Sequence, residues 1–216
     1  MKGRYSSKMT ETKNGKTILT TPFTEKDIRD LHAGDVIYLN GDIVTGRDDV
    51  HIRVTKEGLE LPADICGKAL MHAGPIVKGS EEQGYEVVAI GPTTSMRMEK
   101  LEYDFISRTG VRLIIGKGGM GSLTAEACRE FGAVHCVLPA GNAVFTALCV
   151  EKISGVEWLD LGMAEALWSM RVNGLGPLIV SIDSGGRNIF EEKKKQIAER
   201  KEEQIKEIGK KLRSIL

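Results

Sequence analysis

The sequence has no excess of charge of either sign. Its 216 residues include 30 Lys and Arg and 30 Asp and Glu, so the formal net charge is zero. A balanced charge gives no electrostatic argument for binding nucleic acid or an anionic membrane surface. No apolar run approaches the roughly 18 residues that a membrane span needs. We therefore expect a globular protein with neither a nucleic-acid nor a membrane partner.

Cysteine is also scarce, and its spacing is uninformative for metal binding. The four cysteines are Cys66, Cys128, Cys136 and Cys149, and no two of them form a C-x-x-C pair. This spacing predicts structural thiols in a reducing compartment and no metal site of the chain's own. The first residues, MKGRYSSKMTETKNGK, lack the apolar core of a signal peptide. We expect a cytoplasmic protein whose residues 1–16 form a flexible leader.

What the sequence does contain is an alternation of strand-like and helix-like segments. From residue 85 onward, it predicts strands over 85–92, 111–116 and 133–141, and helices over 93–110, 122–132 and 142–153. A late strand is expected within 176–187. Strands that alternate with helices indicate a mostly parallel central sheet covered by helices.

The first 80 residues hold more strand than helix. They predict strands over 17–20, 34–44 and 67–77, with a bend at Gly41, and a helix over 24–31. Thr24 and Asp27 give that helix a capping-box pattern at its start. A further turn into a helix is expected after residue 45. The expected fold class is therefore α/β, with a second, smaller sheet, in one domain over 17–190.

The tail over 191–216 is strongly charged and carries a narrow apolar stripe. Its members are spaced three or four residues apart, as on one face of a helix: Ile205, Ile208, Leu212 and Ile215. Two interpretations stay open for this amphipathic helix. It packs on its own domain, or it makes a subunit contact.

The most conspicuous motif is the glycine-rich segment GKGGMG, which follows the strand over 111–116. Gly116, Gly118 and Gly121 have the G-x-G-x-x-G spacing of a dinucleotide-binding turn. That fold also needs an acidic residue about 20 positions later, at the end of the next strand, and this chain has none there. The Walker-type phosphate loop fails as well, because Lys117 lies among the glycines. What remains is a helix start with free backbone N–H groups beside one lysine, which suits a carboxylate or a phosphate.

Two further turns between a strand and a helix carry a cation. In GPTTSMRM, Thr93, Thr94 and Ser95 precede Arg97, whose guanidinium can bind both oxygens of a carboxylate. The alternative for this turn is a plain helix cap with a solvated arginine. Such turns gather at the carboxyl ends of parallel strands, where ligands bind.

The third turn, TGRDDVH, offers Arg47 with Asp48, Asp49 and His51 close by. Asp48 can orient Arg47 or cap the next helix. The alternative for the whole turn is a surface turn with an ion pair. Two arginines and one lysine at one edge of the sheet would fit a small ligand with two carboxylates.

Six segments in order give the chain a family resemblance over about residues 17–190. They are DVIYLNGDIVTGRDDVH, GKALMHAGPIV, GPTTSMRME, GKGGMG, PAGNAV and LDLGMAEALW…GPLIVSID. The chain resembles the β subunit of iron–sulfur-dependent hydro-lyases, the class I fumarase and L-tartrate dehydratase family. HAGPIV, GPTTSMRME and GKGGMG together are more similar to the tartrate dehydratases. Two positions depart from the fumarases, which usually have alanine in place of Gly46 and an aromatic residue in place of His72.

The resemblance implies a three-layer swivelling β/β/α domain and a four-carbon dicarboxylate substrate that loses or gains water. It also implies a four-iron four-sulfur cluster whose cysteine ligands belong to an α subunit, in an α2β2 heterotetramer.

The resemblance also assigns roles to individual residues. Thr93 is implied as the catalytic base and Lys117 as a second catalytic residue. The implied substrate contacts are Arg47, Thr93, Thr94, Ser95, Arg97 and Lys117. His51 and His72 are further candidates. For His72, two interpretations stay open: a contact with the extra hydroxyl of tartrate, or a histidine satisfied within the sheet.

Overall fold

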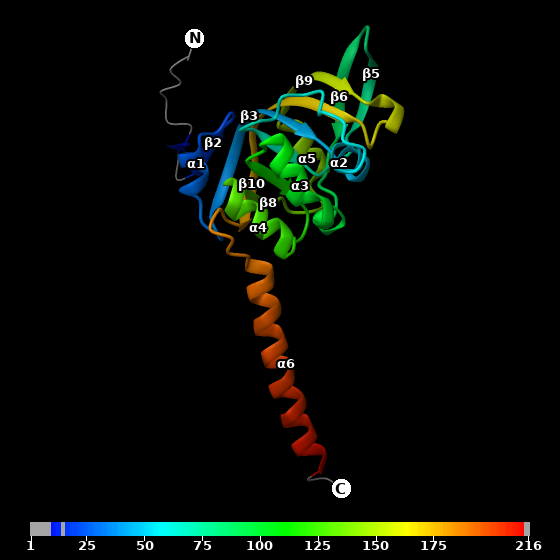
Figure 1. Cartoon of the computed structure of the whole chain (residues 1–216). Helices are drawn as coiled ribbons and strands as arrows, with labels where there is room; N and C mark the ends of the chain where they lie inside the picture. Colours follow the sequence, from blue (N-terminus) through cyan, green and yellow to red (C-terminus); the bar gives the residue numbers. More distant parts are fainter. Residues whose placement is uncertain (1–9, 14–15, 214–216) are drawn as a thin grey trace.

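The structure, a computed structural model, describes residues 10–13 and 16–213 (Figure 1). Its strands are β1 (Thr10–Lys13), β2 (Lys16–Thr20), β3 (Val36–Thr45), β4 (Ala69–Met71), β5 (Ile76–Ser80), β6 (Gly84–Ala89), β7 (Leu113–Gly116), β8 (Val134–Val137), β9 (Val150–Glu157) and β10 (Leu167–Ile182). Its α-helices are α1 (Glu25–Arg29), α2 (Asp48–Thr55), α3 (Glu99–Thr109), α4 (Ser122–Phe131), α5 (Ala143–Leu148) and α6 (Ile189–Arg213). Two 3-10 turns complete the list, η1 (Ser95–Arg97) and η2 (Leu159–Leu161). The α/β class is confirmed.

The main sheet is mixed, and part of it closes into a barrel. Eight strands run in the order β1-β2-β3-β4-β7-β8-β10-β9, and β10 also pairs with β3. The β2, β3, β4, β7 and β8 neighbours are parallel, whereas β10 is antiparallel to β3, β8 and β9. The expectation of a mostly parallel sheet is therefore only half right. The sequence predicts only a late strand within 176–187, whereas β10 begins at Leu167. Gly174 and Gly176 mark register shifts inside this one strand rather than its start.

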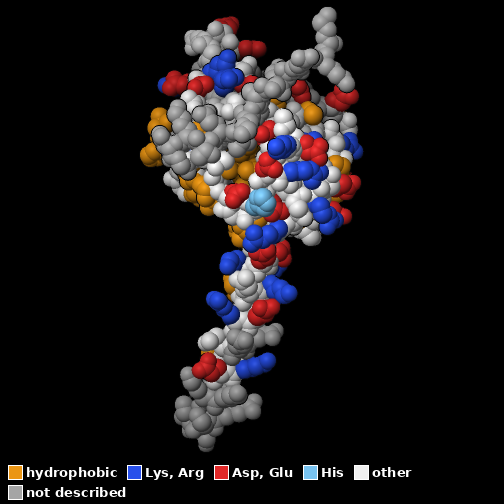
Figure 2. All heavy atoms as spheres, turned by 90° about the vertical axis from the view of Figure 1, so that its left-hand side faces the viewer, with side chains coloured by type: hydrophobic (Ala, Val, Ile, Leu, Met, Phe, Trp, Pro, Cys, Tyr) orange, Lys and Arg blue, Asp and Glu red, His pale blue; other side chains and the backbone are white. Residues whose placement is uncertain are grey.

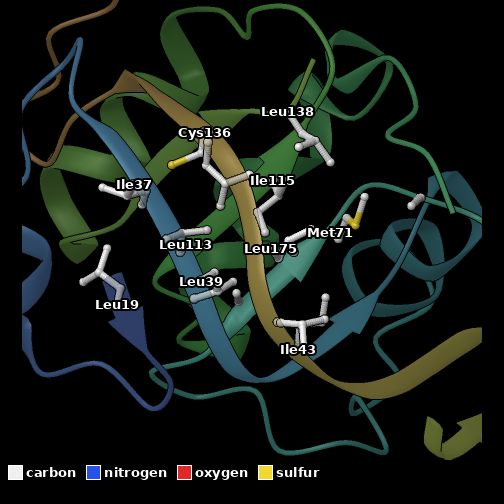
Figure 3. Close-up of a cluster of buried hydrophobic side chains, with 14 of the residues drawn as sticks. Leu19, Ile37, Leu39, Ile43, Met71, Leu113, Ile115, Cys136, Leu138 and Leu175 are labelled. Atoms are coloured by element: carbon white, nitrogen blue, oxygen red, sulfur yellow. The ribbon is translucent and has the colours of Figure 1, made fainter. Parts of the chain in front are cut away.

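The pleat of the strands separates two apolar clusters. Ile43, Met71 and Leu113 face the interior of the barrel, where they meet Cys136 and Leu175 (Figure 3). The residues between them, such as Val44, Leu70 and Ile114, face the layer formed by α2, α3 and α4. Alternate side chains of a strand point to opposite faces, so these strands are buried on both sides.

Three boundaries differ from the sequence expectations. The segment 67–77 forms two strands, β4 and β5, rather than one, because the chain leaves the main sheet at His72 and begins the small antiparallel β5–β6 sheet. The segment 142–153 is helical only to Leu148, since Val150–Glu157 pairs with β10. The helix over 93–110 begins as the 3-10 turn η1 before α3, and ends at Gly110 as expected.

The two ends of the chain differ from the body. Of the expected leader, residues 10–13 form β1 on the edge of the sheet, and residues 1–9 and 14–15 lie outside the described residues. The capping box of Thr24 and Asp27 is present at α1.

At the other end, α6 extends away from the body with charges of both signs along it (Figures 1 and 2). Ile197, Ile205 and Ile208 are each more than half exposed, so they do not pack on their own domain. The subunit-contact alternative stays a prediction, and Ile215 lies outside the described residues. No helix in the described part of the chain combines the length and the apolar character that a membrane crossing requires.

Candidate active site at the carboxyl edge of the sheet

Three predicted site residues come directly after parallel strands. Arg47 follows β3 by two residues, His72 follows β4, and Lys117 follows β7. Because β3, β4 and β7 are parallel neighbours, their carboxyl ends lie at one edge of the sheet. The structure therefore brings the Arg47, His72 and Lys117 positions together, as the spacing of the turns predicts.

The segment that leads into η1 is threaded between two of these strand ends. The Thr93 N–H donates to the His72 carbonyl at 2.7 Å, and the Lys117 N–H donates to the Thr93 carbonyl at 3.1 Å. The Ser95 N–H donates back to the Lys117 carbonyl at 3.1 Å. The backbone also passes very close, because a Cβ on Gly116 would overlap Ser95 Oγ. Glycine is therefore needed at 116 for this close approach.

The two arginines of the site each hold a carboxylate of the chain. Arg97 pairs with Asp48 at 2.5 Å, and Arg47 pairs with Glu165 at 3.0 Å. Arg97 thus lies against the first residue of α2, next to Arg47. The Arg47 Nε is buried without a hydrogen-bond partner, so this guanidinium retains an unused donor. Asp48 therefore pairs with Arg97 rather than capping α2, whose N-cap has no side-chain hydrogen bond.

The hydroxyls of this edge differ in exposure. Thr94 is exposed and Thr93 half-buried, whereas Ser95 is fully buried. The expected helix cap is absent, since the N-cap of η1 makes no side-chain hydrogen bond. Lys117 is half-buried, and among the residues that the structure describes no carboxylate pairs with its ammonium. Threonine hydroxyls and an ammonium without a carboxylate partner are groups that a ligand can use.

The glycine-rich turn does not present the free N–H groups that its sequence predicts. The Glu99 carboxylate accepts from the N–H groups of Gly121 at 2.7 Å and Leu123 at 2.9 Å. It also accepts from the Thr124 hydroxyl at 2.6 Å. The anion at the start of α4 is therefore a side chain of the same chain. Our expectation of an open anion site there is wrong, because a residue 22 positions away in sequence caps the helix.

A buried polar cluster lies directly behind the edge. The Nε2 atoms of His51 and His72 lie 3.3 Å and 3.2 Å from the same oxygen, Oε2 of Glu102. All three side chains are completely buried. The Nδ1 of His72 faces Ser95 Oγ at 3.0 Å, and the Nδ1 of His51 faces the Arg47 carbonyl at 2.7 Å. His72 therefore lies within the protein interior, which favours the second of its two interpretations.

Burial and charge act in opposite directions on this cluster. Burial alone would raise the pKa of Glu102, but the two facing imidazoles lower it well below its usual range. Burial lowers the pKa of His72, and the charge of Glu102 opposes that shift. Sequence reasoning missed Glu102. Its only signal was its place on the buried face of α3, three positions from Phe105.

The chain's cysteines do not form a ligand set for an iron–sulfur cluster. Cys128 and Cys136 are buried, Cys149 is half-buried and Cys66 is exposed elsewhere. Burial raises the pKa of the Cys128 and Cys136 thiols, which keeps them protonated and unsuited as thiolate ligands. The residues of this chain thus do not fit such a cluster.

The fold and the turns define an α/β protein that gathers two arginines and one lysine at the carboxyl edge of its parallel strands. A family model described as "Fumarase C-terminus" matches residues 2–193. The chain belongs to this family.

Three relatives show the range of similarity. The chain is 52% identical over 193 residues to the L(+)-tartrate dehydratase subunit beta of Escherichia coli (strain K12), covering 89% of this chain and 96% of that protein. It is 41% identical to a putative L(+)-tartrate dehydratase subunit beta of Methanocaldococcus jannaschii over 84% of this chain and 95% of that one. It is 38% identical to a putative fumarate hydratase class I of Geobacillus stearothermophilus, over 84% of this chain but 35% of that protein.

Proposed function

We propose that the chain is the β subunit of a two-subunit hydro-lyase that reversibly removes water from a four-carbon hydroxydicarboxylate. The proposed reaction converts L-tartrate to oxaloacetate. The observation that carries this proposal is the gathering of Arg47, Arg97 and Lys117 at one edge of the sheet, in a chain 52% identical to a tartrate dehydratase β subunit. The second candidate is a class I fumarate hydratase, favoured by the similarity to the Geobacillus protein.

The cations suit the charge that the reaction develops. Removing a proton next to a carboxylate builds negative charge on that carboxylate. Arg47, Arg97 and Lys117 stabilise this charge and hold the diacid in a fixed orientation. Among the described residues no carboxylate pairs with the Lys117 ammonium, so it can bind a substrate carboxylate without displacing a protein partner, and the buried Arg47 Nε is a further donor of this edge that makes no hydrogen bond.

We propose Thr93 as the base that removes the proton, with Thr94 in the same turn as a supporting substrate contact. Ser95, which the sequence also proposed as a contact, is fully buried with its hydroxyl facing His72, so it supports the turn from behind. A threonine hydroxyl is a weak base, so it needs activation by neighbouring charge or a partner base. The Lys117 N–H donates a hydrogen bond to the Thr93 carbonyl, so Lys117 and Thr93 are spatial neighbours. The α subunit is an alternative source of the activating group.

We further propose that an α subunit binds the four-iron four-sulfur cluster, in a cytoplasmic α2β2 heterotetramer. The lack of a cysteine ligand set in this chain supports this division. The fold is proposed to be the swivelling β/β/α domain of such β subunits.

The α subunit is also the proposed occupant of an apolar surface on α5. Val144, Phe145 and Leu148 are 65%, 77% and 78% exposed, which is unusual for neighbouring large apolar side chains. This surface is continuous with the site, because the Ile90 N–H donates to the Ala143 carbonyl just before the turn that leads to Thr93. One partner can therefore cover α5 and complete the site.

A reconstitution assay tests the function. The chain is purified alone and with an α-type partner carrying an intact cluster, and water loss is followed from L-tartrate, malate and related diacids. We expect turnover only with the partner and the highest kcat/KM with L-tartrate. A higher kcat/KM with malate would favour the fumarate hydratase. Binding of diacids without any turnover by the assembled pair would instead identify a non-catalytic carboxylate-binding module.

A further inference from the structure

The buried cluster behind the site connects residues from four separate elements. His51 lies on α2, His72 follows β4, Ser95 begins η1 and Glu102 lies on α3. A single carboxylate oxygen, Glu102 Oε2, is within 3.3 Å of both imidazoles. The outer nitrogens of the two rings then reach the Arg47 carbonyl and the Ser95 hydroxyl. The cluster therefore joins the two turns that carry Arg47 and Arg97.

The atoms that face the two ring nitrogens assign the protons of His51. Its Nδ1 faces a backbone carbonyl, which can only accept, so Nδ1 carries a hydrogen. Its Nε2 faces an oxygen of an ionised carboxylate, which also accepts. A ring that donates at both nitrogens is an imidazolium. His51 is thus the positive partner of the Glu102 carboxylate.

The same reasoning makes His72 neutral. Its Nε2 faces the Glu102 carboxylate and carries a hydrogen. A second imidazolium would leave one buried positive charge without a counter-charge, at a cost of several kcal/mol. His72 therefore accepts at Nδ1 from the Ser95 hydroxyl. In this assignment the cluster carries no net charge and the Ser95 hydrogen points at His72.

We infer that Glu102 is a positioning residue: through ionic contacts with His51 and His72, and through the His72–Ser95 hydrogen bond, it forms a charge-balanced unit that sets the Arg47 turn against the Thr93–Arg97 turn. Glu102 and the two histidines touch no substrate, because they are completely buried. They act through the Arg47 carbonyl at the start of α2 and through Ser95, whose N–H and hydroxyl link Lys117 to His72. This inference rests on the proposed function for its catalytic readout and on the structure alone for its protonation readout.

A bound metal ion is the competing explanation for two histidines and one glutamate that converge. The three offer ligand atoms within 4.8 Å of one another. A closed structural site for zinc needs four ligands, and in the described part of the chain this group supplies three. The two Nε2 atoms and both Glu102 oxygens make no hydrogen bond of regular geometry. The proton assignment therefore rests on the ionic contacts of 3.3 Å and 3.2 Å to Oε2, and it needs no fourth ligand.

The protonation readout uses nitrogen NMR of the full chain labelled at its four histidines. At pH 7.5 we expect one imidazolium, His51, with both nitrogens protonated, and one neutral ring, His72, protonated at Nε2. Glu102→Gln removes the counter-charge while keeping the shape, so the imidazolium signal should disappear. A neutral His51 in the unsubstituted chain would overturn the assignment. So would one equivalent of a tightly bound metal ion that the Glu102→Gln chain lacks.

The catalytic readout uses the assembled enzyme. Glu102→Gln should lower kcat about 10- to 100-fold with a much smaller change in KM, because a small misplacement of catalytic groups affects the transition state most. Ser95→Ala, which removes one hydroxyl only, should lower kcat in the same sense but less. It also keeps the test decisive if Glu102→Gln fails to fold. Unchanged kcat in the folded variants would overturn the positioning role.

A matched control makes the same chemical change elsewhere. Glu130 on α4 is exposed and accepts from the Tyr103 hydroxyl at 2.7 Å. Glu130→Gln should leave kcat, KM and the histidine spectrum unchanged. If the unsubstituted pair turns over no diacid at all, the proposed function fails while the NMR result still decides the protonation of the cluster.

Discussion

The turn before η1 and the turn before α4 lie at the same edge of the sheet but offer a ligand different surfaces. At the start of α4, the Glu99 carboxylate occupies the N–H groups of Gly121 and Leu123. At the start of η1, no side chain caps the turn, and the Thr94 side chain is exposed. We call these the closed turn, residues 117–124, and the open turn, residues 91–97.

The difference teaches that a glycine-rich helix start is not by itself a ligand site. Helix N-termini attract any carboxylate, whether it comes from a substrate or from the chain itself. In the closed turn, an internal carboxylate meets that need, and only Lys117 at its beginning is left for the substrate. In the open turn, the Thr94 hydroxyl is exposed, and Arg97, although it pairs with Asp48, keeps 44% of its side chain exposed to a ligand.

The largest expected effect comes from removing the cations of the open turn and its border, which are Arg97 and Lys117. Arg97→Ala or Lys117→Ala should lower turnover of the assembled enzyme by roughly 10²- to 10³-fold or more, because each removes a charge that stabilises the developing carboxylate charge. Steady-state kinetics and circular dichroism would measure activity and folding. Arg171→Ala is the matched control, since Arg171 pairs with Asp42 on another part of the sheet. Near-normal turnover of both site variants would contradict the assignment of Arg97 and Lys117 to the active site.

The next effect concerns the apolar surface on α5, which lies next to the open turn. Leu148→Glu should weaken binding of the α subunit by roughly 10-fold or more, because it places a charge in the centre of an apolar contact. Titration calorimetry or analytical ultracentrifugation would measure this. Leu59→Glu, a change at another exposed apolar residue, should leave the affinity unchanged. Equal affinities for all three chains would show that the partner binds elsewhere.

The closed turn should respond in stability rather than in chemistry. Glu99→Gln removes the charged cap of α4 and should lower the free energy of unfolding by about 1–2 kcal/mol. Turnover per folded molecule should stay within about threefold. Urea unfolding and kinetics on the same preparation would check both, with the exposed Glu126→Gln as control. A large loss of kcat without a loss of stability would show that the closed turn binds substrate.

A further effect, away from both turns, is expected from acid. Burial lowers the pKa of His135 to about 3 and also lowers that of His72. The unfolded chain takes up these protons near pH 6.5, so stability falls as the pH drops from about 6.5 towards 4, by up to about 1.4 kcal/mol per pH unit per histidine. His135→Gln should flatten this dependence in urea unfolding at several pH values. A pH-independent stability between 6.5 and 4.5 would contradict the buried neutral histidines.

The sequence predicted most elements because their signals are local. Thr24 and Asp27 mark a helix start, Gly110 and Gly132 mark helix ends, and all four appear in the structure. The carboxyl-edge gathering of Arg47 and Lys117 followed from the parallel order of the strands. The end of α5 at Leu148 could not be predicted, because Val150 joins a strand only through its pairing with β10.

The distinction between the open and the closed turn was not visible in the sequence either. Glu99 meets the start of α4 only after α3 and α4 pack together. The same holds for Glu102, whose two imidazole partners are 51 and 30 positions away by residue number. Contacts of this kind are set by tertiary packing, on which local patterns carry no information.

Hydrogen exchange of the assembled enzyme with and without L-tartrate tests the central comparison most directly. Peptides that cover 92–98 and 120–126 report the open turn and the helix start of the closed turn in one experiment. We predict that saturating L-tartrate slows exchange over 92–98 and leaves 120–126 unchanged, because Glu99 already holds those amides. Slower exchange over 120–126 with no change over 92–98 would contradict the account.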